Sequence, residues 1–176
     1  NNTAMGHNSL STNILSDHNV AIGNDALATH NTATSVDAYN VAVGSGAGTA
    51  VTTGTSNTLI GGNAGDSLNT GGFNVALGTD ALGGDTKGNA SVAVGRLALT
   101  SQNFTTATDV YNTGVGHAAG GAITTGINNT LIGGNAGDAL TDADYNVAVG
   151  AFALTNDTEG SRNVAVGQIA LATQNF

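Results

Sequence analysis

The sequence predicts an all-β protein, a parallel β-solenoid of about ten coils that occur in two lengths. Three observations support this prediction. A five-residue unit, Asn-x-x-apolar-Gly, recurs ten times along the chain. The apolar residues of the unit alternate as they do in a short strand. The 176 residues include 27 glycines but no proline, cysteine or tryptophan, which suits closely stacked coils better than a thick aromatic core.

The repeating units are regularly spaced, and a longer period is superimposed on them. The units end at Gly6, Gly23, Gly44, Gly61, Gly78, Gly95, Gly116, Gly133, Gly150 and Gly167. A short coil has seventeen residues, as from Gly44 to Gly61, and a long coil has twenty-one, as from Gly23 to Gly44. Three short coils and one long coil make a super-repeat, as from Gly23 to Gly95, and residues 57–66 return unchanged as residues 129–138. We therefore expect residues 1–176 to form a single repeat array, and the similarity of residues 171–176 to residues 99–104 indicates a segment of a longer array.

Each unit predicts a short strand that is apolar on both faces. Side chains alternate along a strand, so Val41 and Val43 point to one side and Ala42 to the other. One face is expected to close the interior of a thin coil. The other face needs a covering layer, for which a neighbouring subunit is the candidate. An aspartate at Val43 is accordingly expected to block folding.

A second half-motif divides the coils into two classes. Three residues after the unit's glycine there is usually Ala, followed by Leu or by Gly. The Ala-Leu class comprises residues 26–27, 81–82, 98–99, 153–154 and 170–171, and the Ala-Gly class comprises residues 47–48, 64–65, 119–120 and 136–137. Coils of one class come in adjacent pairs. Leu59 and Leu131 replace the strand's Ala next to coils that have Ala42 or Gly114, which predicts a large side chain packed beside a small one.

The repeating asparagine predicts a hydrogen-bonded ladder. Equivalent residues of successive coils lie about 4.8 Å apart, a distance at which amide side chains bond to one another and satisfy buried polar groups. We expect this role for Asn19, Asn40, Asn57, Asn74, Asn112, Asn129, Asn146 and Asn163. Glycosylation is the alternative, but it requires Ser or Thr two residues further on, where the unit has Ala, Leu or Gly.

The two long coils are expected to project from one side of the stack. Their four extra residues lie within residues 29–39 and 100–111. Asp37 and Asp109 stand where most other coils have glycine, three residues before the repeating asparagine, and we expect a left-handed turn at these positions. Together with Tyr39 and Tyr111 they are the candidate residues for binding at the surface.

The phrase Asn-Val-Ala-Val-Gly, followed by x-x-Ala-Leu, resembles the head repeats of trimeric autotransporter adhesins and the repeats of phage-type tail fibres. The resemblance covers residues 2–171. It implies a left-handed parallel β-roll and an intertwined or side-by-side homotrimer. It also implies a role in extending a fibre or attaching it to a host. The coils of this chain are longer than the adhesin-head repeat.

The function expected from these features is that of a structural segment in a homotrimeric extracellular or virion fibre that supports attachment to a host or other surface. The alternative is an adhesin head whose long-coil loops bind a glycan or a receptor. The expected location is extracellular, on a virion tail fibre or on a bacterial cell surface.

The charge balance makes other partners unexpected. Lys87, Arg96 and Arg162 are the only basic side chains apart from histidine, and the net charge is −9. Binding to nucleic acid depends on Lys and Arg and is not expected. No apolar stretch approaches the length of a membrane helix, so we expect no membrane insertion of this segment.

A calcium-dependent solenoid is a second alternative. Residues 61–68 and 133–140 approach the calcium-binding nonapeptide, with Asp66 and Asp138 as the candidate ligands. Both copies have Ala where the nonapeptide has its third glycine, and they do not occur in tandem. Turn capping by these two aspartates is the simpler interpretation.

The histidines and the possible catalytic residues give no clear sign of a metal site or an active site. One histidine from each chain of a trimer could form an axial metal site, but His7, His18, His30 and His117 do not share one repeat position, and placement in turns or at the surface is favoured. No Ser-His-Asp set repeats and no phosphate-binding loop is present, so neither an enzyme nor a cofactor is expected.

Overall fold

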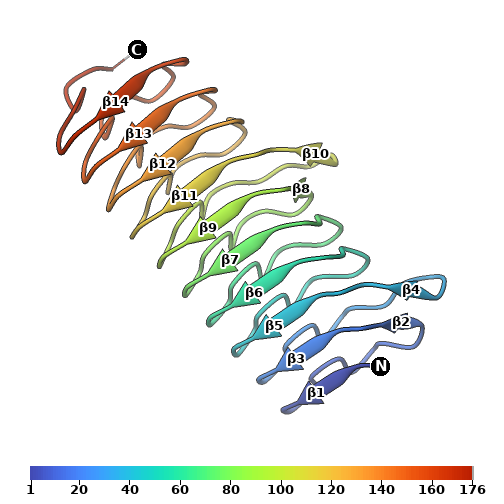
Figure 1. Ribbon diagram of the computed structural model, residues 1–176. Helices are drawn as coiled ribbons and strands as arrows, with labels where there is room; N and C mark the ends of the chain where they lie inside the picture. Colours follow the sequence, from blue (N-terminus) through green and yellow to red (C-terminus); the bar gives the residue numbers. More distant parts are fainter. Residues whose placement is uncertain (176) are drawn as a thin grey trace.

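The computed structural model describes residues 1–175 and is a regular solenoid with one short strand per coil (Figure 1). The strands form one ten-stranded parallel sheet in the order β1-β3-β5-β6-β7-β9-β11-β12-β13-β14. Their bounds are Thr3–Met5 (β1), Val20–Ile22 (β3), Val41–Val43 (β5), Thr58–Ile60 (β6), Val75–Leu77 (β7), Val92–Val94 (β9), Thr113–Val115 (β11), Thr130–Ile132 (β12), Val147–Val149 (β13) and Val164–Val166 (β14). Residues 1–175 contain no helix. The predicted all-β parallel solenoid of about ten coils is therefore confirmed.

Four further strands belong to the long coils and their neighbours. Strand β2 (Ser16–Asp17) pairs with β4 (Val36–Asp37), and β8 (Gly88–Asn89) pairs with β10 (Thr108–Asp109), all in parallel. In Figure 1, β4 and β10 extend beyond the adjacent coils at the right of the stack. The turns that follow the strands of the ten-stranded sheet lie on the opposite side. The extra residues of both long coils therefore project from the same side.

The middle residue of each strand from β3 to β14 faces the interior. Ala42, Leu59 and Ala76 are fully buried, and the strand register places Leu59 between the other two. Val41 and Val43 lie on the outer face and are only half-buried. The sequence left open which face closes the coil, and the structure assigns this role to the Ala face. Because Val43 lies on the half-buried outer face, we expect an aspartate there to disturb the covering layer more than the folding of one chain, and this stays a prediction.

Leucine side chains fill the coil interior from two different places. In the Ala-Leu coils they come from the second half-motif, as with the fully buried Leu82. In the first pair of Ala-Gly coils Leu59 enters from the strand instead. A β-carbon on Gly48 would lie 2.7 Å from Cδ1 of Leu59, and one on Gly65 would lie 2.8 Å from its Cδ2. Gly48 and Gly65 therefore lack side chains where the two δ-methyl groups of Leu59 pack.

The glycine that ends each unit is required by two constraints at once. Gly61 has a φ of +135°, and an added β-carbon would lie 2.6 Å from the carbonyl carbon of Gly78 in the next coil. L-amino acids rarely adopt this backbone conformation, and the coil spacing leaves no room for a side chain. These two constraints explain why the position is glycine in all ten units.

The glycines three residues before the repeating asparagine are required by close coil spacing and not by the left-handed turn that the sequence predicts. Gly54 has no positive φ, but a β-carbon on it would lie 2.3 Å from the carbonyl oxygen of Gly71. Asp37 and Asp109 do not have a positive φ either, because they belong to the paired strands β4 and β10. The left-handed residues are Tyr39 and Tyr111, two positions further on. The predicted left-handed turn at Asp37 and Asp109 is thus wrong by two residues.

The total solvent-accessible area of the thin stack is small for its mass. Its accessible surface is 7198 Å² for a mass of 17.1 kDa. A compact monomer of this mass exposes about 7,800 Å² on average. Small side chains and close coil spacing compensate for the elongated shape, so the exposed area alone does not demand association. What distinguishes this protein is the kind of side chain that covers its sheet.

Candidate functional site

The outer side of the long sheet is a continuous apolar surface, which we call the apolar face. Its first column is Thr3, Val20, Val41, Thr58, Val75, Val92, Thr113, Thr130, Val147 and Val164, and its second column is Met5, Ile22, Val43, Ile60, Leu77, Val94, Val115, Ile132, Val149 and Val166. Most are half-buried within the stack, while Leu77 and Ile132 expose 44% and 39% of their surface. Neither column contains a charged residue. A flat, exposed face of this composition is typical of a protein interaction surface.

A second feature lies at the corner of the coil, one residue before each repeating asparagine. We call these residues the corner column: His18, Tyr39, Ser56, Phe73, Ala90, Tyr111, Asn128, Tyr145 and Arg162, all with φ between 51° and 62°. Four of them are aromatic and expose 48–67% of their surface. Side chains in this backbone region carry strain, and strain of this kind concentrates at functional sites. Tyr39 and Tyr111 are among the predicted surface-binding residues, whereas Phe73 and Tyr145 are not, although all four stand one residue before the repeating asparagine.

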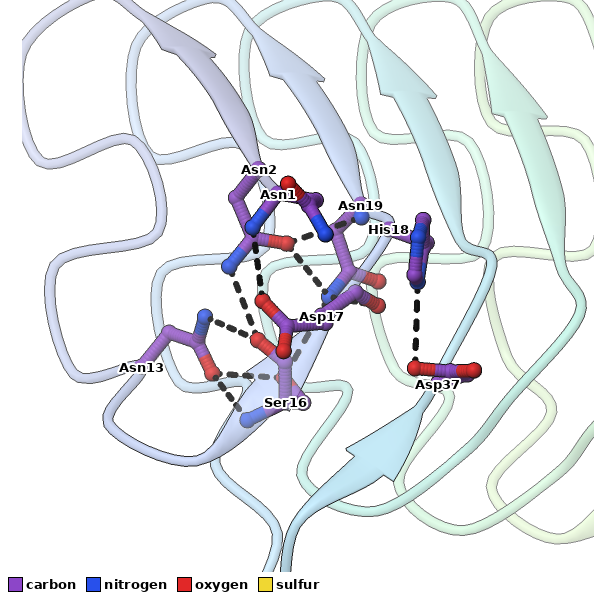
Figure 2. A network of polar contacts seen from close by, with 8 residues as sticks. All are labelled: Asn1, Asn2, Asn13, Ser16, Asp17, His18, Asn19 and Asp37. Carbon is purple, nitrogen blue, oxygen red and sulfur yellow. Dashed lines mark hydrogen bonds and ion pairs between the residues drawn. The ribbon is translucent and has the colours of Figure 1, made fainter.

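The first long-coil site contains Asp37, Tyr39 and the corner residue His18. Figure 2 shows the His18 ring directed toward Asp37, and His18 Nδ1 lies 3.1 Å from Asp37 Oδ1. The hydroxyl of Tyr39 donates to Asp37 Oδ2 at 3.3 Å. The negative charge of Asp37 raises the pKa of Tyr39 above its ordinary value. The His18 and Tyr39 rings stack with their centroids 5.2 Å apart and their planes at 21°.

The second long-coil site has equivalent backbone positions but different side-chain contacts. Asn89 Nδ2 donates to Asp109 Oδ1 at 3.1 Å. Tyr111 is 57% exposed, and its corner neighbours are Ala90 and Asn128. The two long-coil sites lie four coils apart, roughly 19 Å along the stack. The structure therefore keeps Asp37 and Tyr39 in one site and Asp109 and Tyr111 in another.

The repeating asparagines make the same set of contacts in successive coils. Asn57 Oδ1 accepts from the backbone N–H of Asn74 at 3.1 Å. Its Nδ2 donates to the carbonyl oxygen of Gly71 at 2.9 Å and to Asn40 Oδ1 at 3.2 Å. A backbone N–H of the next coil donates in the same way to the side-chain oxygen of each of these asparagines: Asn19, Asn40, Asn57, Asn74, Asn112, Asn129 and Asn146. The last donor of the series is the backbone N–H of Asn163. All of these are buried except Asn163, which is partly buried.

The ladder changes where Ser91 replaces asparagine. The buried side chain of Gln102 spans this position: its Nε2 donates to Ser91 Oγ at 2.9 Å, and its Oε1 accepts from Asn112 Nδ2 at 3.0 Å. Gln102 Nε2 also donates to the buried carboxylate of Asp85 at 2.6 Å. Asp85 in turn accepts from the backbone N–H of Gly88 at 3.0 Å. This network satisfies a buried carboxylate with hydrogen bonds, as burial of a charge requires.

The position of Asp85 and Gln102 was not recognised from the sequence. It lies seven residues after the unit's glycine and points into the coil. It is apolar in the Ala-Gly coils (Val51, Leu68, Ile123 and Leu140) and polar in the Ala-Leu coils (His30, Asp85, Gln102, Asp157 and Gln174), as is Asn13 in the first coil, which has Ser9-Leu10. The alternation with coil class was the available signal. This signal is hard to recognise in the sequence, because a polar residue at this position is normally interpreted as a surface residue.

The two calcium candidates have different surroundings. Asp138 accepts from Asn135 Nδ2 at 2.8 Å and from the Thr155 hydroxyl. The pKa of Asp66 is raised, first by burial and further by the negative charge of Asp80. Within residues 1–175 there is no group of three or more His, Cys, Asp or Glu side chains that could hold a metal ion. Asp66 thus has one further carboxylate nearby, that of Asp80, which falls short of such a group.

The four histidines are dispersed, as their different repeat positions suggest. His7 Nδ1 lies 3.2 Å from Asn24 Oδ1, and His117 Nε2 lies 3.2 Å from Arg96 Nη1, both at the surface. His18 belongs to the first long-coil site. His30 is fully buried, contrary to the favoured placement at a turn or surface, and neither ring nitrogen has a hydrogen-bond partner among the described residues. Burial lowers the pKa of His30.

Comparison with protein-family models, with curated proteins and with solved structures finds no match to this chain. The part of the chain that the structure describes contains no helix with the length and apolarity needed to span a membrane. It also encloses no pocket. The apolar face and the corner column are the two surface features described above.

Proposed function

We propose that the chain is a structural segment of a homotrimeric extracellular or virion fibre that supports attachment to a host or other surface. The observation behind this proposal is the apolar face. Two uninterrupted columns of Val, Ile, Leu, Met and Thr remain partly exposed on a single chain, over ten strands. Roughly 43 Å of such a surface, at about 4.8 Å per coil, favours a covering layer of equal length.

Another copy of this chain is the covering layer that matches best. Its sheet has the same coil spacing, so apolar side chains of two or three copies meet at every level of the stack. Burial of apolar area is worth about 25 cal/mol per Å², and repetition over many coils adds many small gains. The resemblance to adhesin heads and tail fibres supports three copies around one axis.

The test is the mass of the assembled protein, measured by light scattering or sedimentation equilibrium. We expect a trimer for the unchanged chain. Val43→Asp with Val94→Asp places charges on the apolar face and should yield a folded monomer by circular dichroism. Thr79→Asp is the matched control at an exposed turn and should remain trimeric. A stable monomer of 17.1 kDa for the unchanged chain would contradict the proposal.

A second candidate function is an adhesin head that binds a glycan or a receptor through the long-coil loops. The observation that favours it is the pair of exposed sites at Asp37 with Tyr39 and at Asp109 with Tyr111. Tyr39→Ala combined with Tyr111→Ala should abolish attachment to the target surface while leaving the trimer mass unchanged. Unchanged attachment would instead indicate a spacer role.

A further inference from the structure

One position of the corner column lacks the stacking group that its two equivalents in the neighbouring super-repeats have. His18, Ala90 and Arg162 are equivalent residues of successive super-repeats. His18 stacks on Tyr39, and the guanidinium carbon of Arg162 lies over the ring of Tyr145 at 5.2 Å from its centroid. Two of the three equivalent positions therefore place a planar, nitrogen-bearing group on a tyrosine face. The third position has the methyl group of Ala90.

The space beside Ala90 is bounded by two aromatic residues. Phe73 precedes Ala90 by one coil and Tyr111 follows it by one coil, so the two side chains leave the stack about 10 Å apart. They start from the same backbone conformation, with φ of 60° and 54°. We call the gap between them the Ala90 slot. A planar group midway in the slot would lie about 5 Å from each ring, which matches the 5.2 Å of both observed stacks.

The stacking direction determines what fits the slot. His18 and Tyr39 belong to successive coils and face each other, so the faces of these two rings are directed along the stack, and the proposal assigns the same direction to Phe73 and Tyr111. A group that enters from the side, between two rings, can be sandwiched. A linear polymer that lay along the column would contact the edges of the rings and not their faces. The slot therefore suits a planar group at the end of a side chain.

The charge around the slot favours a cation that donates hydrogen bonds. Asp109 Oδ1 is bonded by Asn89, while Asp109 Oδ2 has no hydrogen-bond partner among the described residues. In the first super-repeat the equivalent Asp37 uses both oxygens, one toward His18 and one toward Tyr39. The net charge of −9 attracts basic partners. An external donor can therefore take the role that His18 has at Asp37.

We propose that the Ala90 slot binds the guanidinium group of an arginine side chain on a basic partner protein, stacked between Phe73 and Tyr111 and donating to Asp109. Guanidinium combines a planar face, several N–H donors and a fixed positive charge, and it stacks on aromatic rings more readily than an ammonium group does. Arg162 on Tyr145 is the intramolecular precedent. One chain builds the whole slot, so the proposal is independent of the fibre assignment.

The experiment uses the assembled protein with ¹³C-labelled alanine methyl groups. The probe is an acetylated and amidated Gly-Arg-Gly peptide, and the comparison peptides contain lysine or citrulline in place of arginine. We expect saturable shifts of the Ala90 methyl signal with the arginine peptide, at least fivefold weaker binding of the lysine peptide, and no saturable shift with the citrulline peptide. Equal responses to arginine and citrulline, or no shift of Ala90, would overturn the proposal.

Variants then test the residues of the slot. Ala90→His should fill the slot from within, as His18 does beside Tyr39, and abolish binding; the φ of Ala90, 59°, is close to the 61° of His18. Thr79→His adds the same side chain at an exposed turn and should leave binding unchanged. Tyr111→Ala and Asp109→Asn, both at exposed positions, should each weaken binding about tenfold. Binding that survives Ala90→His or Asp109→Asn in the folded protein would disprove the assignment.

Discussion

Leu59 occupies the space that a side chain on Gly65 would need. A β-carbon on Gly65 would lie 2.8 Å from Leu59 Cδ2, and both residues are fully buried in the same coil. One coil later the arrangement is reversed: Ala76 is in the strand and Leu82 is in the position of Gly65. Gly65 and Leu82 have nearly the same φ, 56° and 54°. The two coil classes are therefore two ways of filling one interior volume.

This relationship predicts strong coupling between the two positions. Leu59→Ala should cost about 3 kcal/mol of unfolding free energy by leaving a cavity. Gly65→Leu alone should prevent stable folding because its side chain would collide with Leu59. The double variant removes the collision with Leu59 but keeps Leu68, whose Cδ1 would lie 2.9 Å from the added β-carbon, so it should recover part of the loss. Urea denaturation at one protein concentration measures the cycle, and additive effects would contradict the shared-volume explanation.

The ladder predicts a large effect of a single amide. Asn57→Ala removes the acceptor of the Asn74 N–H and the donor to the Gly71 carbonyl, both of which are buried. Leaving two buried polar groups unsatisfied should lower the unfolding free energy by about 2–4 kcal/mol. Asn24→Ala, at an exposed turn, is the control and should change it by less than about 0.5 kcal/mol. Urea midpoints of the two variants that coincide would argue against the ladder as a source of stability.

His30 predicts a loss of stability on mild acidification. Burial lowers its pKa, so between the folded pKa and the unfolded value of about 6.5 the unfolded chain binds more protons than the folded one. Its contribution to stability is fully present above about pH 6.5 and is lost as the pH falls below that value. His30→Gln, which introduces the residue found at the equivalent position 102, should flatten the profile. Urea midpoints from pH 5.5 to 7.5 test this, and an unchanged slope would exclude His30 as its cause.

Asp66 and Asp138 predict opposite effects at equivalent positions. Burial and the charge of Asp80 raise the pKa of Asp66, which means that its ionised form is disfavoured in the folded chain. Asp66→Asn should therefore raise the thermal midpoint at neutral pH, and the gain should disappear in acid, where Asp66 is protonated. Asp138→Asn replaces a carboxylate that accepts from Asn135 and Thr155 and should lower the midpoint. Calorimetry with and without millimolar calcium completes the test, and a calcium-dependent rise that Asp66→Asn abolishes would instead favour the calcium alternative.

Sequence reasoning found the parts of this protein that repeat. The unit from Asn40 to Gly44 specifies the strand and its position, since every coil contributes the same polar, apolar and glycine sites at the same spacing. Leu59 beside Ala42 was expected from its exchange with Ala, and the strand register places these two residues side by side. Asp85 and Gln102 do not follow from the sequence pattern because polar residues seldom occupy a thin core, and a network of hydrogen bonds makes that location possible.

The solenoid, its coil lengths and its super-repeat thus follow from the amino-acid pattern alone, because parallel stacking brings equivalent residues into contact at every coil. Only the tertiary structure decided which face of each strand is inside, and it places Ala42 inside and Val43 outside. A strand apolar on both faces carries no signal that distinguishes them. The structure also decided that Tyr39 and Tyr111, rather than Asp37 and Asp109, adopt the left-handed conformation. These outcomes depend on contacts between coils that a linear pattern does not express.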